Sequence, residues 1–207
     1  MFKYLLVLLL IPFFGDAQIL DSIDTYDYKE FENQTLKVFS DSGVIQLQAI
    51  SPNFIKLSFS KRSDSEKSEN TSLSDLVYVR ITQNLESIFM PTDSLLIVIS
   101  KLDFNIKFQN RREQLYTTNQ SISFSNEGLN LKLSKNNDEV FYNLKRKKLK
   151  PKDYSINKLK SISSSKSYEL LFDKNSKGNL DLRNSSILNL NFDKPAAFVY
   201  YFKQTKT

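Results

Sequence analysis

The sequence predicts an all-β fold, an antiparallel β-sandwich, from three observations. Apolar and polar residues alternate in short runs, turn signals separate these runs at short intervals, and no segment carries the 3.6-residue stripe of an amphipathic helix. Alternation with period two buries one face of a strand and leaves the other in water. The length of 207 residues suits one domain or at most two small ones.

Residues 1–17 have the pattern of a secretory signal peptide. Lys3 precedes an apolar run at 4–14, and the small residues Gly15 and Ala17 suit a cleavage site. The run is too short to span a bilayer. We therefore expect export to a periplasm or the exterior and no membrane contact after cleavage; an uncleaved anchor is the alternative. Export without any cysteine is more typical of bacteria than of eukaryotic secretion.

The rest of the chain is expected to form one sandwich. Residues 18–33 are acidic and loosely patterned, which predicts an irregular lead-in to a domain over 34–207. Alternating runs predict strands at 45–49, 55–59, 77–81, 104–108, 129–133 and 188–192. Two runs, 95–99 and the one from Phe198 to Phe202, are apolar on both faces, as in central strands. The alternation places nine side chains in one core: Ile55, Leu57, Phe59, Phe104, Ile106, Phe108, Leu188, Leu190 and Phe192.

The net charge of +6 has a local origin, because six basic residues fall within positions 145–152. Nucleic-acid binding would require aromatic residues interleaved with the basic ones. Only Tyr142 and Tyr154 flank this cluster. We therefore interpret it as a solvated loop within a long excursion over 145–167, and we expect no nucleic-acid partner.

Three absences exclude most catalytic machinery. Without cysteine there is no disulfide, thiolate metal site or cysteine nucleophile, and without histidine there is no Ser-His-Asp triad or imidazole ligand. The four glycines lie too far apart for a dinucleotide-binding or phosphate-binding loop. No calcium-loop pattern is present, so we expect neither a metal nor a cofactor. Carboxylate, lysine or tyrosine chemistry remains, or no chemistry.

Three residues are candidates for carbohydrate contact. Asp173 and Asp181 flank a turn, and the turn predicts that they meet at the end of a hairpin. A glycosidase would need one such carboxylate in an apolar pocket; the alternative is ordinary turn chemistry, which Asp138 and Glu139 share. Tyr142 offers a ring of the kind that stacks on a sugar, although tyrosines in strands lie more often in a core.

The C-terminal stretch resembles the end of the N-terminal β-sandwich of glycoside hydrolase family 31 (GH31), the α-glucosidase and α-xylosidase family. That family pattern runs Y-G-L-F-F-D-N, a short turn, a D-F-G-like element and a closing D-Y-Y-F-I pair of strands. Upstream, 42–59 is similar to the opening strand pair of the family, 92–116 to its next hairpin, and 140–144 (VFYNL) falls where the family has Y-G-L-G-E. The matching C-terminal positions are Tyr168, Leu170, Leu171, Phe172, Asp173, Asn175, Leu180, Asp181, Leu182, Val199, Tyr200, Tyr201 and Phe202.

The resemblance implies a galactose mutarotase-like sandwich and a non-catalytic, carbohydrate-associated module, truncated or orphaned from its enzyme. The family's (β/α)₈ barrel would begin where this chain stops, and the barrel carries the catalytic carboxylates. No catalytic residue is therefore carried over, and we expect no activity from the chain alone. The alternatives are an exported structural or interaction sandwich with no sugar role and, less favoured, a small carboxylate hydrolase.

A protein partner or self-association is also expected. In the family this sandwich packs on the barrel, so an apolar face would lack its partner here. The run from Phe198 to Phe202 is expected to lie at that face, with Val199 and Tyr201 near the contact. The competing interpretation buries the strand between two sheets and exposes nothing.

Overall fold

The fold is described from a computed structural model that covers residues 21–23, 25–63, 77–112, 115–124, 128–173, 175–193 and 200–204. The expected signal peptide at 1–17 lies outside the described residues, as does Val199. Within these ranges, no helix is both long enough and apolar enough to cross a bilayer. One helix of four residues, α1 (Ile156–Leu159), accompanies the strands.

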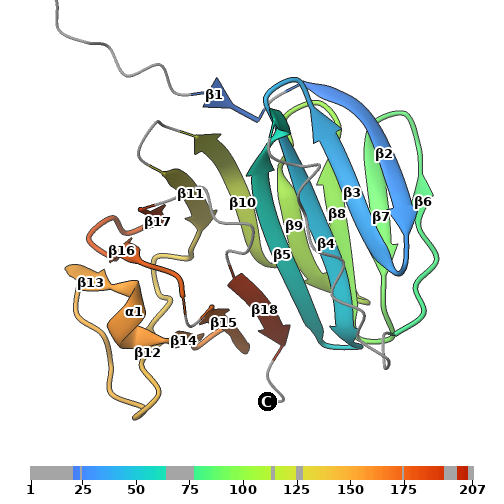
Figure 1. Ribbon diagram of the computed structural model, residues 1–207. Helices are drawn as coiled ribbons and strands as arrows, with labels where there is room; N and C mark the ends of the chain where they lie inside the picture. The colour runs from blue at the N-terminus through green and yellow to red at the C-terminus, as the bar shows by residue number, and fades with distance from the viewer. Residues whose placement is uncertain are drawn as a thin grey trace, which may run out of the picture.

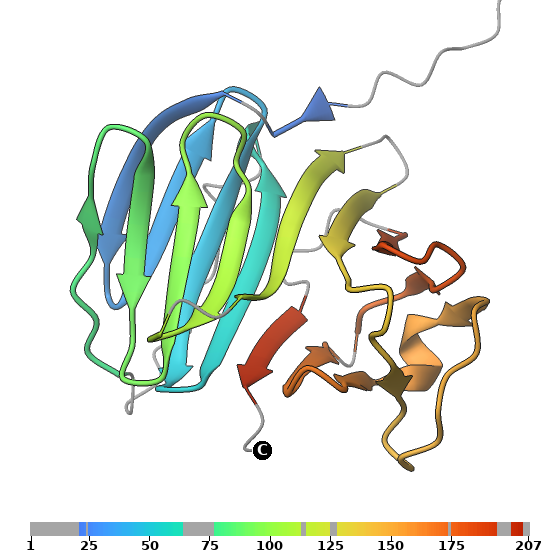
Figure 2. The same cartoon turned by 180° about the vertical axis from the view of Figure 1, so that it is seen from behind.

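Two antiparallel sheets make up the molecule (Figures 1 and 2), which confirms the predicted fold class. The larger sheet has the order β13-β16-β17-β11-β10-β9-β8-β7-β6, with β1 added on β10. Its strands are β1 (Asp21–Ser22), β6 (Thr82–Gln83), β7 (Ser87–Pro91), β8 (Leu95–Ser100), β9 (Ile106–Asn110), β10 (Leu115–Phe124), β11 (Leu129–Ser134), β13 (Asp153–Ser155), β16 (Gly178–Asp181) and β17 (Ile187–Phe192).

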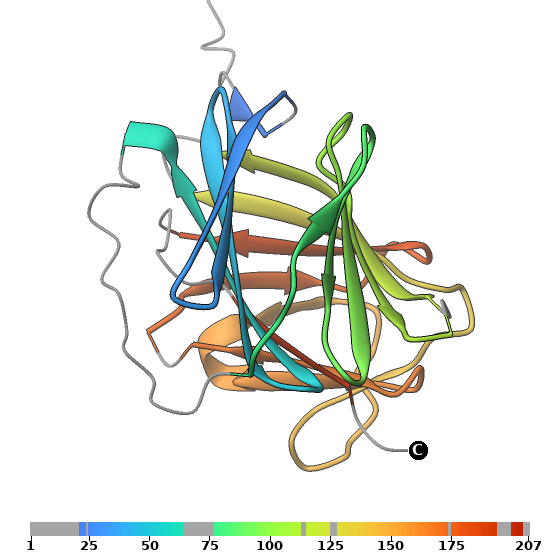
Figure 3. The ribbon, with the colours of Figure 1, turned by 90° about the vertical axis from the view of Figure 1, so that its right-hand side faces the viewer.

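The smaller sheet has the order β12-β14-β15-β18-β5-β4-β3-β2. In Figure 3, strands β2 to β5 of this smaller sheet form a layer that lies opposite strands β6 to β9 of the larger sheet. Its strands are β2 (Tyr26–Glu32), β3 (Thr35–Ser40), β4 (Gly43–Ser51), β5 (Phe54–Lys61), β12 (Phe141–Tyr142), β14 (Ser161–Ser164), β15 (Tyr168–Phe172) and β18 (Tyr200–Gln204).

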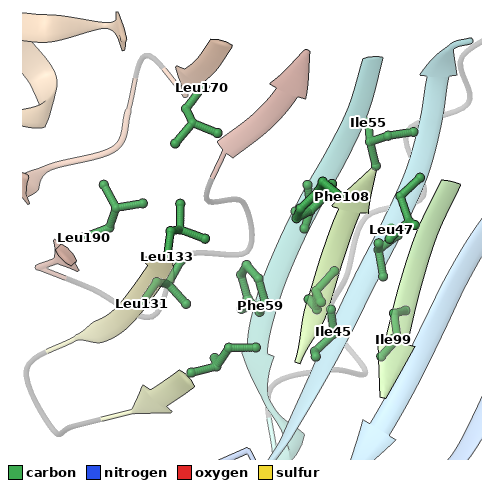
Figure 4. Packing of buried hydrophobic residues seen from close by; sticks show 14 of the residues in the cluster. Ile45, Leu47, Ile55, Phe59, Ile99, Phe108, Leu131, Leu133, Leu170 and Leu190 are labelled. Atoms are coloured by element: carbon green, nitrogen blue, oxygen red, sulfur yellow. The ribbon is translucent and has the colours of Figure 1, made fainter. Parts of the chain in front are cut away.

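A single hydrophobic core fills the space between the sheets (Figure 4). All nine side chains that the alternation assigned to the core are at most 3% exposed, so that prediction is confirmed. Both sheets contribute: Ile45, Leu47 and Phe59 point inward from the smaller one, and Ile99 and Phe108 from the larger. The register holds because a shift by one residue would turn each apolar set to water.

The expected irregular lead-in is wrong, because Tyr26–Glu32 forms β2. Most of its side chains are exposed, so apolar and polar residues do not alternate in its sequence and the strand could not be predicted from the pattern. The strand is held by its ladder with β3 and by Tyr28, whose ring stacks on Phe39 at 4.3 Å between centroids. Asn33 and Gln34 close this hairpin with φ of 49° and 59°, the positive values of a type I′ turn.

The run at 77–81 keeps its predicted alternation without forming a strand. Val79 is buried at 2% exposure, yet its backbone N–H donates to the side-chain oxygen of Gln34 (3.2 Å) and not to a neighbouring strand. The ladder begins only with the short β6. This segment therefore buries alternate side chains without forming the backbone hydrogen bonds of a β-strand.

The run at 95–99 and the described part of the run from Phe198 to Phe202 both lie inside their sheets. β8 pairs with β7 and β9, although Leu96 and Val98 on its outer face are only half-buried. β18 pairs with β15 on one side and β5 on the other, so its backbone offers no open edge. Self-association through residues 198–202 stays a prediction, because the side chains of this segment lie outside the described residues.

Candidate functional site

The three sequence-predicted contact residues lie in different places. Tyr142 is half-buried on β12, the edge of the smaller sheet, opposite Ser163. Asp173 follows β15; its carboxylate accepts the N–H of Asn175 (3.3 Å). Asp181 is the last residue of β16 in the larger sheet.

Asp173 and Asp181 do not meet at the end of a hairpin, which corrects the sequence prediction. β15 belongs to the smaller sheet and β16 to the larger, so the segment between them crosses from one sheet to the other. Asp181 is the C-terminal residue of β16, at the end of the strand that does not join this crossing. Asp, Asn and Gly favour any reversal of the chain and do not specify which strands it joins.

Gly178, at the start of β16, is required by its position. Its φ is +147°, and a Cβ there would lie 2.0 Å from the carbonyl oxygen of Asn191. Only glycine permits this approach of β16 to β17. The close pairing fixes the register that places Asp181 opposite Asn189.

Asp181 belongs to a polar surface on the outer side of the larger sheet. Its inward neighbours Leu180 and Leu190 are fully buried, so residues in alternate positions face outward. In one row Asp181 pairs with Asn189 and Asn189 with Lys132; in the next, Asn179 pairs with Asn191 and Asn191 with Asn130. We call these six residues the polar sheet face: Asn130, Lys132, Asn179, Asp181, Asn189 and Asn191.

Not all side-chain amide groups of this face have hydrogen-bond partners in the described part of the chain. The side-chain amide of Asn130 donates to the side-chain oxygen of Asn191. In the described part of the chain, the Oδ1 atoms of Asn130 and Asn189 have no hydrogen-bond partner although both are shielded from solvent. Unsatisfied polar atoms of this kind cost free energy, but because these two are shielded from solvent a ligand on the surface does not reach them.

The Asp181 carboxylate is fixed as an anion. Arg183 donates to it from Nε (2.9 Å), Nη2 (2.8 Å) and its backbone N–H (2.9 Å). These hydrogen bonds lower the pKa of Asp181, with smaller contributions from the charges of Arg183 and Lys135. Arg183 also contacts Asp153 at 3.3 Å. Asp181 can accept hydrogen bonds, but a carboxylate held ionised in this way is unsuited to act as a general acid at neutral pH.

Lys135 lies beside the polar sheet face. Its Nζ donates to the carbonyl oxygen of Leu182 (3.2 Å). Burial lowers the pKa of Lys135, while the charges of Glu139 and Asp181 oppose that shift. Lys135 therefore connects this end of the larger sheet electrostatically to a second, buried group of polar residues around Glu139.

Sequence reasoning missed this buried group. Glu139 accepts hydrogen bonds from the Ser164 hydroxyl and from the backbone N–H of Asn136 (3.0 Å). Tyr168, fully buried, has a pKa raised well above its usual value by burial, then by the charge of Glu139 and a hydrogen bond with it. Thr117 on β10 completes the group, which thereby joins the two sheets. Because Glu139 and Tyr168 are both buried, the group holds the sandwich together and does not face a ligand.

The Asp181–Arg183 pair makes a testable contribution to stability. A carboxylate with a lowered pKa in the folded state stabilises the fold above its unfolded pKa of about 4 and loses that effect as pH falls through the folded value. We expect Asp181→Asn to be less stable than wild type near neutral pH, and the difference to narrow below about pH 4. The effect is small because Arg183 is exposed and water screens the pair.

Urea unfolding at a series of pH values measures this difference, with Arg183→Gln as the matched control. In the Arg183→Gln background, Asp181→Asn should have little further effect at any pH. A difference that stays constant into the acid range would show that the ion pair is not its cause.

No family model and no curated protein matches this sequence. Solved structures do match. A GH31 dextranase from Flavobacterium johnsoniae, complexed with isomaltotriose, superposes with a TM-score of 0.75 and 16% identity over 90% of this chain. The cycloalternan-forming enzyme of Listeria monocytogenes, in complex with a pentasaccharide substrate, gives 0.74 and 11% over 90%, and a GH31 α-xylosidase from a soil metagenome, complexed with xylose, gives 0.68 and 12% over 87%.

The match covers only part of each neighbour: 27% of the dextranase, 21% of the cycloalternan-forming enzyme and 32% of the α-xylosidase. The chain therefore spans about a quarter of the length of these enzymes. At such low identity the likeness concerns the fold. This chain has the fold of the β-sandwich part of GH31 enzymes, as its sequence pattern predicts.

Proposed function

We propose that this chain is a non-catalytic, carbohydrate-associated module of the GH31 type and that the polar sheet face is its sugar contact. The observation that carries the proposal is the superposition of 90% of the chain on about a quarter of a dextranase. These neighbours are complexed with isomaltotriose, a pentasaccharide substrate and xylose, which supports a sugar ligand for this chain.

The chemistry of the polar sheet face suits hydroxyl groups. Each asparagine amide both donates and accepts, and the Asp181 carboxylate accepts, so a row of them matches the alternating donors and acceptors of a sugar chain. Asn179 and Asn191 are exposed, so their amides are within reach of a ligand. None of the six residues is aromatic, so binding rests on hydrogen bonds in competition with water, and we expect an affinity of about millimolar.

We expect the chain to bind isomaltooligosaccharides without hydrolysing them. Asp181 lies opposite Asp153 in the ladder with β13, but Arg183 contacts both carboxylates and holds Asp181 ionised. Asp173 caps a turn, so neither Asp173 nor Asp181 is set up as a proton donor. Titration with isomaltotriose, followed by amide chemical shifts, should perturb β11, β16 and β17. Asn179→Ala, at an exposed position of the face, should weaken binding about tenfold, the effect of losing one or two hydrogen bonds.

The control variant is Asn175→Ala, an exposed asparagine in the turn before β16. It should bind the sugar as wild type does. Equal losses in both variants, or shifts confined to the smaller sheet, would contradict the assignment of the face. Turnover of an aryl α-glucoside that Asp173→Asn or Asp181→Asn abolishes would overturn the non-catalytic role.

An interaction module without a sugar role is the second candidate. Leu85, in the turn before β7, is 96% exposed, and Leu102, in the turn before β9, is 86% exposed. The two turns are held together by a hydrogen bond from the backbone N–H of Lys101 to the carbonyl oxygen of Glu86 (2.8 Å). Exposed leucines in two neighbouring turns are typical of a protein contact. This function requires no response of the polar sheet face to sugars, so the same titration separates the two.

A further inference from the structure

The loop between β12 and β13 accounts for the whole net charge of the protein. It contains Lys145, Arg146, Lys147, Lys148, Lys150 and Lys152 and no acidic residue. Without these six, the chain would hold 23 basic and 23 acidic residues. The charge is therefore concentrated in one segment, which we call the basic loop (143–152). In Figures 1, 2 and 3 it projects from the lower end of the molecule.

The basic loop is held in a defined shape by its own backbone. The Asn143 side chain accepts the N–H groups of Lys145 and Lys147 (both 3.0 Å), and the Asn143 N–H donates to the Lys147 carbonyl (3.0 Å). Farther along, the Tyr154 hydroxyl accepts the N–H of Lys150 (2.8 Å). The cations are thus presented on a folded turn, and a partner need not order them on binding.

Among the described residues, no acidic side chain neutralises the charges of the basic loop. All six basic side chains are exposed, and none takes part in an ion pair within the described part of the chain. The acidic residue next in sequence, Asp153, pairs with Arg183 instead. Such a concentration of one sign attracts anions over about 10 Å at moderate salt.

An apolar side chain stands among these cations. Leu144 is 61% exposed and comes directly before Lys145 in the turn. A water-soluble polyanion gains nothing from Leu144, and a nucleic acid would need free rings. The Tyr154 ring instead lies beneath Lys152 (5.2 Å) with its hydroxyl bonded to Lys150, and Tyr142 is half-buried. Cations around an exposed leucine are typical of contact with the boundary between lipid headgroups and acyl chains.

We propose that the basic loop docks the protein onto a surface of anionic phospholipid, with the cations facing the headgroups and Leu144 entering the boundary region. This peripheral contact departs from the sequence expectation of no membrane partner. It is argued separately from the sugar contact, because none of the six residues of the polar sheet face belongs to the basic loop.

Partition onto vesicles tests the proposal with the full chain. Binding is measured to vesicles of phosphatidylcholine with roughly one third phosphatidylglycerol and to vesicles of phosphatidylcholine alone. The ratio of the two affinities removes the contribution of the apolar run near the N-terminus, which binds both kinds of vesicle. Lys147→Gln with Lys148→Gln should lower the ratio about 30-fold. Lys107→Gln with Lys177→Gln removes two exposed lysines outside the loop and should leave the ratio within about twofold of wild type.

Leu144→Ser separates a lipid surface from a general polyanion. Its binding to anionic vesicles should fall by about 3- to 10-fold, while its binding to dextran sulfate should equal that of wild type. Equal ratios for the two lysine double variants would overturn the proposal. So would an unchanged vesicle affinity of Leu144→Ser, which would assign the loop to soluble polyanions.

Discussion

Phe108→Ala is expected to lower the free energy of unfolding by about 3–5 kcal/mol. Phe108 on β9 has no exposed surface and is among the largest buried side chains. Figure 4 shows it in the same cluster as Ile55 and Leu47. Removing the ring loses its burial and leaves a cavity that strands fixed on both sides, by β8 and β10, close only in part.

Urea denaturation followed by circular dichroism measures this loss. The matched control is Lys107→Ala, the neighbouring exposed residue on the other face of β9, which should change stability by no more than about 0.5 kcal/mol. A loss below about 1 kcal/mol for Phe108→Ala would place the ring outside the core and break the assigned register.

Glu139→Ala is expected to lower the free energy of unfolding by about 3 kcal/mol, the second large effect. The substitution removes the acceptor for the Ser164 hydroxyl and for the N–H of Asn136, and it leaves Tyr168 without its hydrogen bond to Glu139. Buried donors that lose a charged acceptor pay their full desolvation cost. Since Thr117 and Tyr168 come from different sheets, the loss also loosens the contact between the sheets.

A double-mutant cycle with Tyr168→Phe identifies the cause. If the two side chains stabilise the fold through each other, the double variant should be more stable than the summed single losses predict. Asp138→Ala, next in sequence but exposed and ion-paired with Lys166, should leave the denaturation midpoint unchanged. Strict additivity of Glu139→Ala and Tyr168→Phe would show that the buried group does not act as a unit.

The sequence alone determined the fold class, the inward faces and the family likeness. These properties follow from local patterns: a period of two assigns Phe59, Phe108 and Leu190 to the core wherever their strands pair. The order of the runs was enough to relate the chain to the β-sandwich of GH31 enzymes. Asp181 was also singled out from sequence, by its place beside a turn, although the hairpin expected there does not exist.

Only the tertiary structure decided which segments pair and which polar residues meet. β2 has almost no buried face, so its place in the sheet depends on its partner β3 and not on its own composition. The polar sheet face needs the register of three strands, because Asn130 and Asn179 come together only through Asn191 between them. Glu139 and Tyr168 likewise meet only after the sheets pack. Burial of one face is a local property of a strand, whereas a contact between distant residues is created by the packing of the whole chain.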